Sequence, residues 1–89
     1  MVHKNILISG KVQGVGYRFF IQRIAQQLLV NGFIKNFPDG RVYIEAESEE
    51  EIMNEFIRNC KNGPKYAFVE NMEINDDQIK NMHGFEIRF

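Results

Sequence analysis

The chain has 89 residues, 44% of them hydrophobic, so its length predicts a single domain, residues 1–89, around one core. Its one cysteine cannot form an intrachain disulfide, and no run of about 18 apolar residues or signal-peptide pattern occurs, which argues against secreted and membrane-spanning classes. The net charge of −1 conceals an asymmetry: residues 1–41 carry six basic side chains and one acidic, and residues 42–89 carry five basic and eleven acidic. We therefore predict a cytoplasmic protein with a dipolar surface. The charge distribution alone leaves two interpretations open: the basic half attracts anions, or both halves are ordinary solvated surface.

The first elements along the chain are a strand, a glycine-rich segment and a helix. Residues 4–9 are apolar and β-branched, which predicts a buried strand. Three glycines then fall within residues 10–16. From Tyr17 the apolar residues follow helical spacing, and Asn31-Gly32 is a typical helix end because glycine accepts a left-handed conformation.

A predicted hairpin and a second helix follow. Residues 33–37 and the alternating residues from Val42 indicate two strands joined by a tight turn at Pro38–Gly40. Ser48 to Glu51 has the pattern of a capping box, which predicts a second helix that ends at Asn62-Gly63-Pro64. The apolar face of this helix consists of Ile52, Met53, Phe56, Ile57 and Cys60.

The last third of the chain predicts two more strands. Residues 66–74 form a strand in which Val69 and Met72 break the alternation, so a β-bulge is expected. Residues 75–83 are a polar connection, and residues 84–89 form a short alternating strand. The order β-α-β-β-α-β, followed by a terminal strand, predicts an α+β, ferredoxin-like split βαβ sandwich, with a mainly antiparallel sheet of four to five strands and two helices on one face.

The glycine-rich segment is the strongest candidate for chemistry. A helix N-terminus presents unpaired N–H groups, and glycines allow backbone amides to approach an anion closely. Arg18 lies in the first helical turn, where the helix dipole disfavours a cation unless an anion is shared. From the residues alone, a phosphate-binding loop and a plain glycine turn with a surface arginine both stay open. A second candidate is Asn36, an unusual residue for mid-strand that this fold can bring towards Arg18.

These residues resemble the signatures of the acylphosphatase family. Residues 10–18 match the pattern G-x-V-Q-G-V-x-[FY]-R at every fixed position, and residues 32–42 are similar to G-[aromatic]-x-[basic]-N-x-x-x-G-x-V. The resemblance extends over nearly the whole chain. It departs at Ile34, where the family has a smaller residue, and at Ser48, where the family has glycine, and neither change removes a reacting group.

The resemblance implies a hydrolase that cleaves the carboxyl-phosphate anhydride bond of acyl phosphates, with neither metal nor cofactor. In that family Arg18 binds the substrate phosphate and Asn36 orients the attacking water. The amides of the loop complete the phosphate site, which predicts Gly14, Val15, Gly16, Tyr17 and Arg18 as phosphate-binding residues. Inorganic phosphate or sulfate is expected to compete with the substrate.

The remaining candidates receive structural interpretations. His3 and His83 lack partners at metal-ligand spacing, and Cys60 is predicted to lie in the core.

Two other functions stay open as alternatives, namely a non-enzymatic phosphate sensor and an RNA-binding domain of related fold. The low pI of about 6.1 and the absence of the aromatic RNA-recognition signature disfavour the second. We expect a monomer that binds neither nucleic acid nor membrane.

Overall fold

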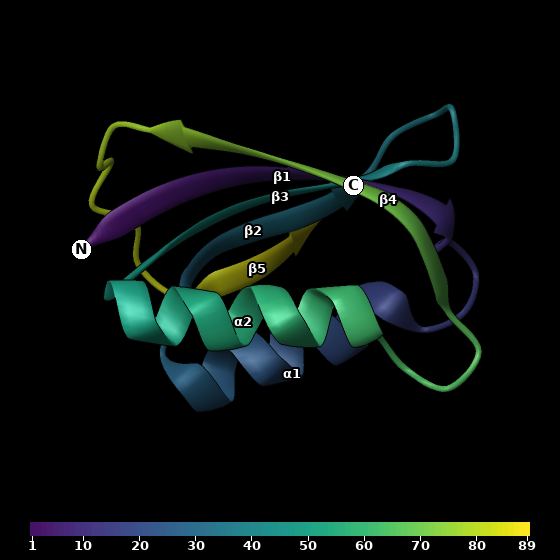
Figure 1. Ribbon diagram of the computed structural model, residues 1–89, viewed down its shortest axis with the longest axis horizontal. Coiled ribbons are helices and arrows are strands. Elements are labelled where there is room, and N and C mark those ends of the chain that lie inside the picture. Colours follow the sequence, from purple (N-terminus) through teal and green to yellow (C-terminus); the bar gives the residue numbers. More distant parts are fainter.

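A five-stranded mixed sheet forms one layer of the computed structural model, which describes all of residues 1–89 (Figure 1). The strand order is β4-β1-β3-β2-β5, and every neighbouring pair is antiparallel except β2 and β5. The elements are β1 (Val2–Lys11), α1 (Tyr17–Leu28), β2 (Asn31–Asn36), β3 (Val42–Ser48), α2 (Glu50–Asn62), β4 (Phe68–Asp77) and β5 (Phe85–Arg88). Both helices lie on one face of the sheet, which confirms the predicted ferredoxin-like α+β fold (Figure 1).

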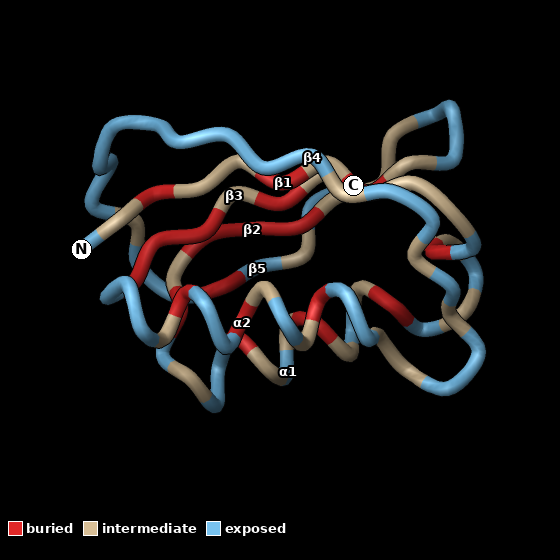
Figure 2. Tube along the Cα trace, viewed as in Figure 1, coloured by how far each residue is buried: buried red, intermediate tan, exposed pale blue.

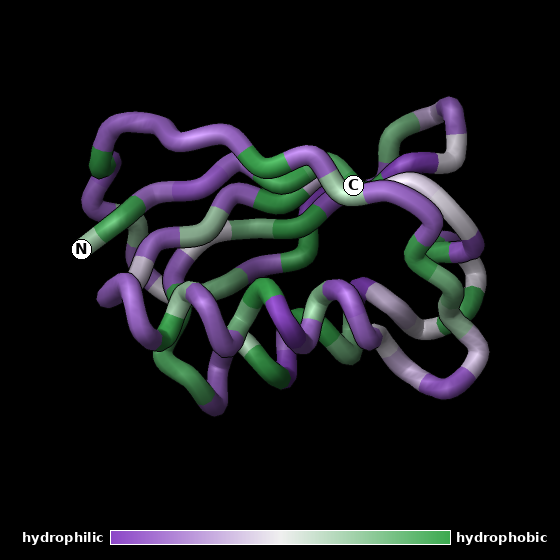
Figure 3. Tube along the Cα trace, in the orientation of Figure 1, coloured by the Kyte–Doolittle hydropathy of each residue, from purple (hydrophilic) through white to green (hydrophobic).

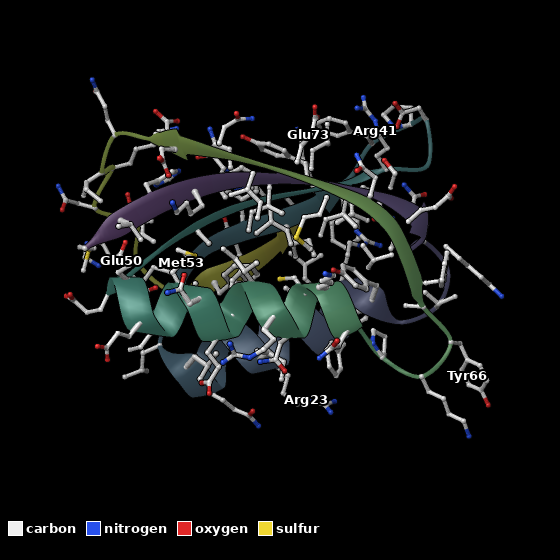
Figure 4. All side chains as sticks on the ribbon, in the orientation of Figure 1. Arg23, Arg41, Glu50, Met53, Tyr66 and Glu73 are labelled. Atoms are coloured by element: carbon white, nitrogen blue, oxygen red, sulfur yellow. The ribbon has the colours of Figure 1, made fainter.

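The core lies between the helices and the sheet (Figures 2 and 3). Alternate residues of the central strands and one face of each helix are buried there, as the spacing of apolar residues predicts. Met53 of α2 lies on the side of the helix that faces the sheet, whereas Arg41 and Glu73 lie on the opposite side of the sheet (Figure 4). Cys60 is fully buried, so its predicted place in the core is confirmed. Neither helix has the length and apolar character needed to span a membrane.

Helix α1 ends earlier than predicted. The residue that adopts the left-handed conformation is Leu29, with φ 59°, and not a glycine. The N–H of Val30 still donates to the Ala25 carbonyl at 2.8 Å, which completes the helix end. Asn31 and Gly32 instead begin β2, because β3 pairs with them on one side and the Gly32 N–H donates to the Gly84 carbonyl on the other. Tertiary pairing therefore overrides the local helix-stop signal.

The predicted capping box at α2 is wrong. Ser48 is the last residue of β3, where it pairs with Val2, and its hydroxyl donates to the Glu49 carbonyl at 2.9 Å. Glu49 occupies the N-cap position and makes no capping hydrogen bond with its side chain. The acidic first turn is present as predicted, with Glu50 and Glu51 near the positive end of the helix dipole.

Strand β4 contains the predicted bulge, but the strand lies further along the chain than expected. Its register against β1 shifts between Ser9, which is opposite Asn71, and Gly10, which is opposite Val69. The strand continues to Asp77 because Asn75 to Asp77 pair with the first residues of β1. The polar connection is correspondingly shorter, and His83 lies within it as predicted.

One end of the sheet collects the two segments that carry the sequence signatures. The loop from β1 to α1 and the turn from β2 to β3 both lie at the right-hand end of Figure 1. The pairing register explains this, because Ile8 of β1 is opposite Val42 of β3, and Val42 is opposite Asn36 of β2. The last residue of β2 is thereby brought to the point where β1 separates from β3, shortly before β1 ends at Lys11.

Candidate active site

A pocket of about 150 Å³ opens between the β1–α1 loop and the end of β2. Seven of its eight lining residues lie between Val12 and Phe19, and the eighth is Asn36. The structure therefore brings the two sequence signatures to one pocket. Of the predicted phosphate-binding residues, only Val15 is not among those that line it, because its side chain packs against the core.

The backbone of the loop presents unpaired N–H groups at the pocket. Gly16 is the N-cap of α1 with φ 76°, a left-handed conformation that glycine adopts without strain, and Gly14 has φ 72°. Phe20 is the first residue whose N–H bonds back into the helix, to the Gly16 carbonyl at 3.1 Å. The N–H groups before it have no acceptor within the helix, and no side chain caps them. They stay available, with the positive end of the helix dipole, to bind an anion.

Arg18 adds a positive charge that no carboxylate neutralises. None of the eight ion pairs in the chain includes it. Its guanidinium carbon lies 4.9 Å from the centre of the Phe89 ring, and one of its nitrogens is 3.5 Å from the Arg88 carbonyl. The guanidinium is thus supported by the end of the chain while its hydrogen-bond donors remain largely free.

Asn36 contributes an unpaired acceptor. Its Oδ1 atom is buried and has no hydrogen-bond partner in the protein. Leaving a buried polar atom unpaired costs roughly 1–3 kcal/mol, so such an atom is kept where a ligand or a water satisfies it. A carboxamide oxygen at the pocket can hold a water molecule by accepting one of its hydrogens.

Gln13 is a site residue to which sequence reasoning assigned no role. It lines the pocket, and its Nε2 donates to the Phe37 and Arg41 carbonyls at 2.9 Å each. Those acceptors lie 24 and 28 residues further along the chain. The sequence contains no signal for such a contact beyond the glutamine's place in the first signature.

A second polar cluster lies at the far end of β1. His3 is buried, with Nδ1 2.8 Å from Glu47 and Nε2 2.9 Å from Glu45. Sequence spacing missed this grouping because its members come from different strands. The ligand atoms of His3, Glu45 and Asp77 lie within 4.8 Å of one another, which is close enough for a metal ion. However, the Lys80 ammonium already lies among the carboxylates, 3.0 Å from Glu45 and 3.2 Å from Asp77.

This cluster holds its carboxylates in the ionised form. Burial opposes ionisation of Glu45 and Glu47, but hydrogen bonds outweigh it and lower both pKa values. The donors to Glu45 are Lys80, Tyr43 and His3, and those to Glu47 are the backbone N–H groups of Lys80 and Met82 with His3. Hydrogen bonds from Asn5, the Gln78 N–H and Lys80 lower the pKa of Asp77 to about 2. The cluster therefore fastens the β4–β5 connection to the sheet, remote from the pocket.

Fold and pocket together define a ferredoxin-like α+β protein with a pocket at the N-terminus of its first helix. The model of the family described as Acylphosphatase matches residues 4–87. A protein named acylphosphatase from Archaeoglobus fulgidus is 43% identical over 89 residues, with 100% of both chains covered. The chain belongs to the acylphosphatase family of hydrolases, as the two signatures predicted.

Solved structures show the same likeness. The crystal structure of acylphosphatase from Bacillus subtilis superposes with a TM-score of 0.97 at 34% identity, covering 100% of both chains. The structure of an acylphosphatase from Coxiella burnetii gives a TM-score of 0.93 at 28% identity, covering 98% of this chain and 92% of that one.

Proposed function

We propose that this chain hydrolyses the carboxyl-phosphate anhydride bond of acyl phosphates and releases a carboxylate and inorganic phosphate. Family membership supports the reaction class. The observation that carries the assignment of roles is the pocket itself, which joins an unpaired guanidinium, unbonded helix N–H groups and the unpaired Oδ1 of Asn36. These are the groups that phosphoryl transfer to water requires.

Arg18 and the loop amides of Gly14 to Arg18 bind the phosphate. The transferred group carries negative charge on its equatorial oxygens, so catalysis depends chiefly on positioning and on positive charge around them. A guanidinium provides paired hydrogen bonds in a planar fork, which a lysine ammonium cannot. Because the chain's own groups supply this charge, we propose that the reaction needs no metal.

Asn36 orients the attacking water. Its amide cannot take up a proton, so its role is to hold the water oxygen in line with the phosphorus. As the water oxygen bonds to phosphorus, the bond from phosphorus to the carboxyl oxygen breaks and its electron pair leaves with the carboxylate. The water proton passes to a phosphate oxygen or to solvent.

The leaving group explains why the pocket needs no acid. A carboxylic acid has a pKa of about 4, so the carboxylate leaves without being protonated at neutral pH. None of the pocket-lining side chains is a carboxylic acid or a histidine. This composition suits an acyl phosphate better than a phosphate ester, whose alkoxide leaving group is far more basic.

The test is phosphate release from a simple acyl phosphate, measured with and without a chelator. We expect turnover that the chelator leaves unchanged and that inorganic phosphate inhibits competitively. Phosphate binding by folded protein without turnover would show a sensor instead of an enzyme, and salt-sensitive RNA binding without turnover would favour an RNA-binding domain. Activity that the chelator abolishes would contradict metal independence alone.

A further inference from the structure

The side chain of Gln13 connects two parts of the pocket that are distant in sequence. Gln13 belongs to the loop between β1 and α1, and its Nε2 donates to the carbonyls of Phe37 and Arg41, both at 2.9 Å. These carbonyls lie at the two ends of the turn between β2 and β3. Phe37 directly follows Asn36, so the contact begins one residue from the proposed water-binding amide.

The turn does not need Gln13 in order to form. The Phe37 N–H donates to the Arg41 carbonyl at 2.8 Å, and the Gly40 N–H donates to the Phe37 carbonyl at 3.2 Å. Gln13 uses the remaining acceptor capacity of the same two carbonyls. Its contribution is therefore the position of the turn relative to the loop, and not the shape of the turn.

The loop itself has few other fastenings. Residues 12–16 lie outside every helix and strand, and Gln13 is the one among them whose side chain makes a hydrogen bond. Val12 is buried in the core, which anchors the loop on the side of β1. Val15 also packs against the core, and Tyr17 is buried where the helix begins, but neither contact joins the loop to the turn beside Asn36. Because Gly14 and Gly16 leave the backbone between these anchors adaptable, the side chain of Gln13 is the tie from the loop to that turn.

The donor count shows that Gln13 is not itself a phosphate ligand. A glutamine amide has two N–H donors, and both are directed at backbone carbonyls. Its remaining polar atom is an oxygen, which repels a phosphate. The residue can therefore influence the reaction only through the groups that it holds.

We propose that Gln13 is a positioning residue that holds the Asn36 amide and the phosphate cradle at the separation needed for in-line attack by water. This inference rests on the proposed function of the pocket. It predicts a defect in the chemical step with phosphate binding largely preserved, because the cradle amides and Arg18 lie within the loop and its helix and move together.

The test compares Gln13→Met with Gln22→Met. Methionine keeps the length of the side chain and removes both donors. Gln22 is a matched control because its Nε2 also donates to a backbone carbonyl, that of Phe85 at 3.3 Å, and it does not line the pocket. We expect Gln13→Met to lower kcat by about 10- to 100-fold, the scale of a misplacement near 1 Å. The dissociation constant for inorganic phosphate should stay within about threefold, and Gln22→Met should change neither quantity by more than that.

A double-mutant cycle then separates positioning from general loosening. In an Asn36→Ala background the water is already unheld, so Gln13→Met should lower kcat by less than about threefold further. A full additional loss would overturn the inference, as would a Gln13→Met protein that keeps the parent's kcat. If Gln13→Met does not fold, Gln13→Asn keeps an amide that is one methylene too short to reach both carbonyls, and the same cycle applies.

The outcomes also distinguish this inference from the function on which it rests. A parent protein without turnover contradicts the proposed function. A parent that turns over, with an Asn36→Ala defect but no Gln13→Met defect, contradicts only the role of Gln13.

Discussion

At the scale of single residues, the proposed mechanism assigns phosphate binding and the chemical step to different side chains. Arg18 carries a charge that no ion pair neutralises, which suits it to its proposed role at the phosphate, whereas Asn36 carries an unpaired oxygen and no charge. The two residues enter the pocket from different elements, α1 and β2, so each can be altered with little direct effect on the other.

Asn36→Ala should therefore lower kcat by on the order of 10²-fold or more, the scale seen when one positioning group is lost. Phosphate affinity should stay within a few-fold of the parent's, because Arg18 and the loop amides are untouched.

Arg18→Lys is the contrasting variant: it keeps the charge but loses the planar fork, so both phosphate affinity and rate should fall. Steady-state kinetics and phosphate titrations on the folded variants decide the matter, and an Asn36→Ala enzyme with the parent's kcat would refute the assigned mechanism.

At the scale of elements, the two ends of β1 contact different parts of the molecule. One end leads into the cradle loop, and the other carries His3 into the cluster with Glu45, Glu47, Asp77 and Lys80. The cluster joins β1, β3, β4 and the connection to β5.

The lowered pKa values in this cluster predict a loss of stability in acid. The folded state favours the ionised forms of Glu45, Glu47 and Asp77, so their contribution is fully present above the unfolded pKa of about 4. This contribution is lost as the pH falls through the pKa values of the folded state, and the pKa of Asp77 in the folded state is about 2. Urea midpoints should therefore drop between pH 5 and pH 2.

Asp77→Asn should start from a lower midpoint at pH 5 and lose less on acidification, since one of the three carboxyls is gone. Glu73→Gln is the control: it lies on the same strand, and its side chain has no hydrogen-bond partner or ion pair in the structure. An Asp77→Asn protein with the parent's full acid loss would show that this network does not set the acid response.

At the scale of the whole molecule, the two helices and the sheet depend on one shared core. Tyr17 is buried at the start of α1 and donates its hydroxyl to the Cys60 carbonyl at 2.6 Å near the end of α2. The first turn of α1, which carries Arg18, is thereby fastened to α2 as well as to the sheet. The geometry of the pocket therefore depends on the packing of the core, because the contact of Tyr17 with α2 places the first turn of α1.

Phe56→Ala should destabilise the whole molecule. Phe56 is fully buried on α2 and meets the Phe85 ring of β5 edge-on, with 5.9 Å between ring centres. Removing a buried phenyl ring costs about 3–5 kcal/mol, a large part of the roughly 5–15 kcal/mol by which domains are stable. Urea unfolding followed by circular dichroism measures it. Phe19→Ala, which removes a ring that is 63% exposed, should change stability by no more than about 0.5 kcal/mol.

The boundaries of the elements show where local patterns reach their limit. The apolar spacing of α1, the alternation of β3 and the Pro38–Gly40 turn were readable because each reflects the period or turn chemistry of the element itself. Asn31-Gly32 and Ser48 were misread because neighbouring strands recruit them into the sheet, and pairing partners 14 or more residues away leave no local signal.

The sequence alone determined the fold class, the family and the two signatures, since periodicity, glycine placement and motif spacing are properties of short segments. Only the tertiary structure decided that Asn36 shares a pocket with Arg18 and that the Oδ1 of Asn36 is unpaired. Only the structure showed that Gln13 donates hydrogen bonds to the turn that follows Asn36. Only the structure joined His3 to two glutamates on β3. These facts depend on strand order and register, which bring together atoms whose separation along the chain carries no information about their distance in space.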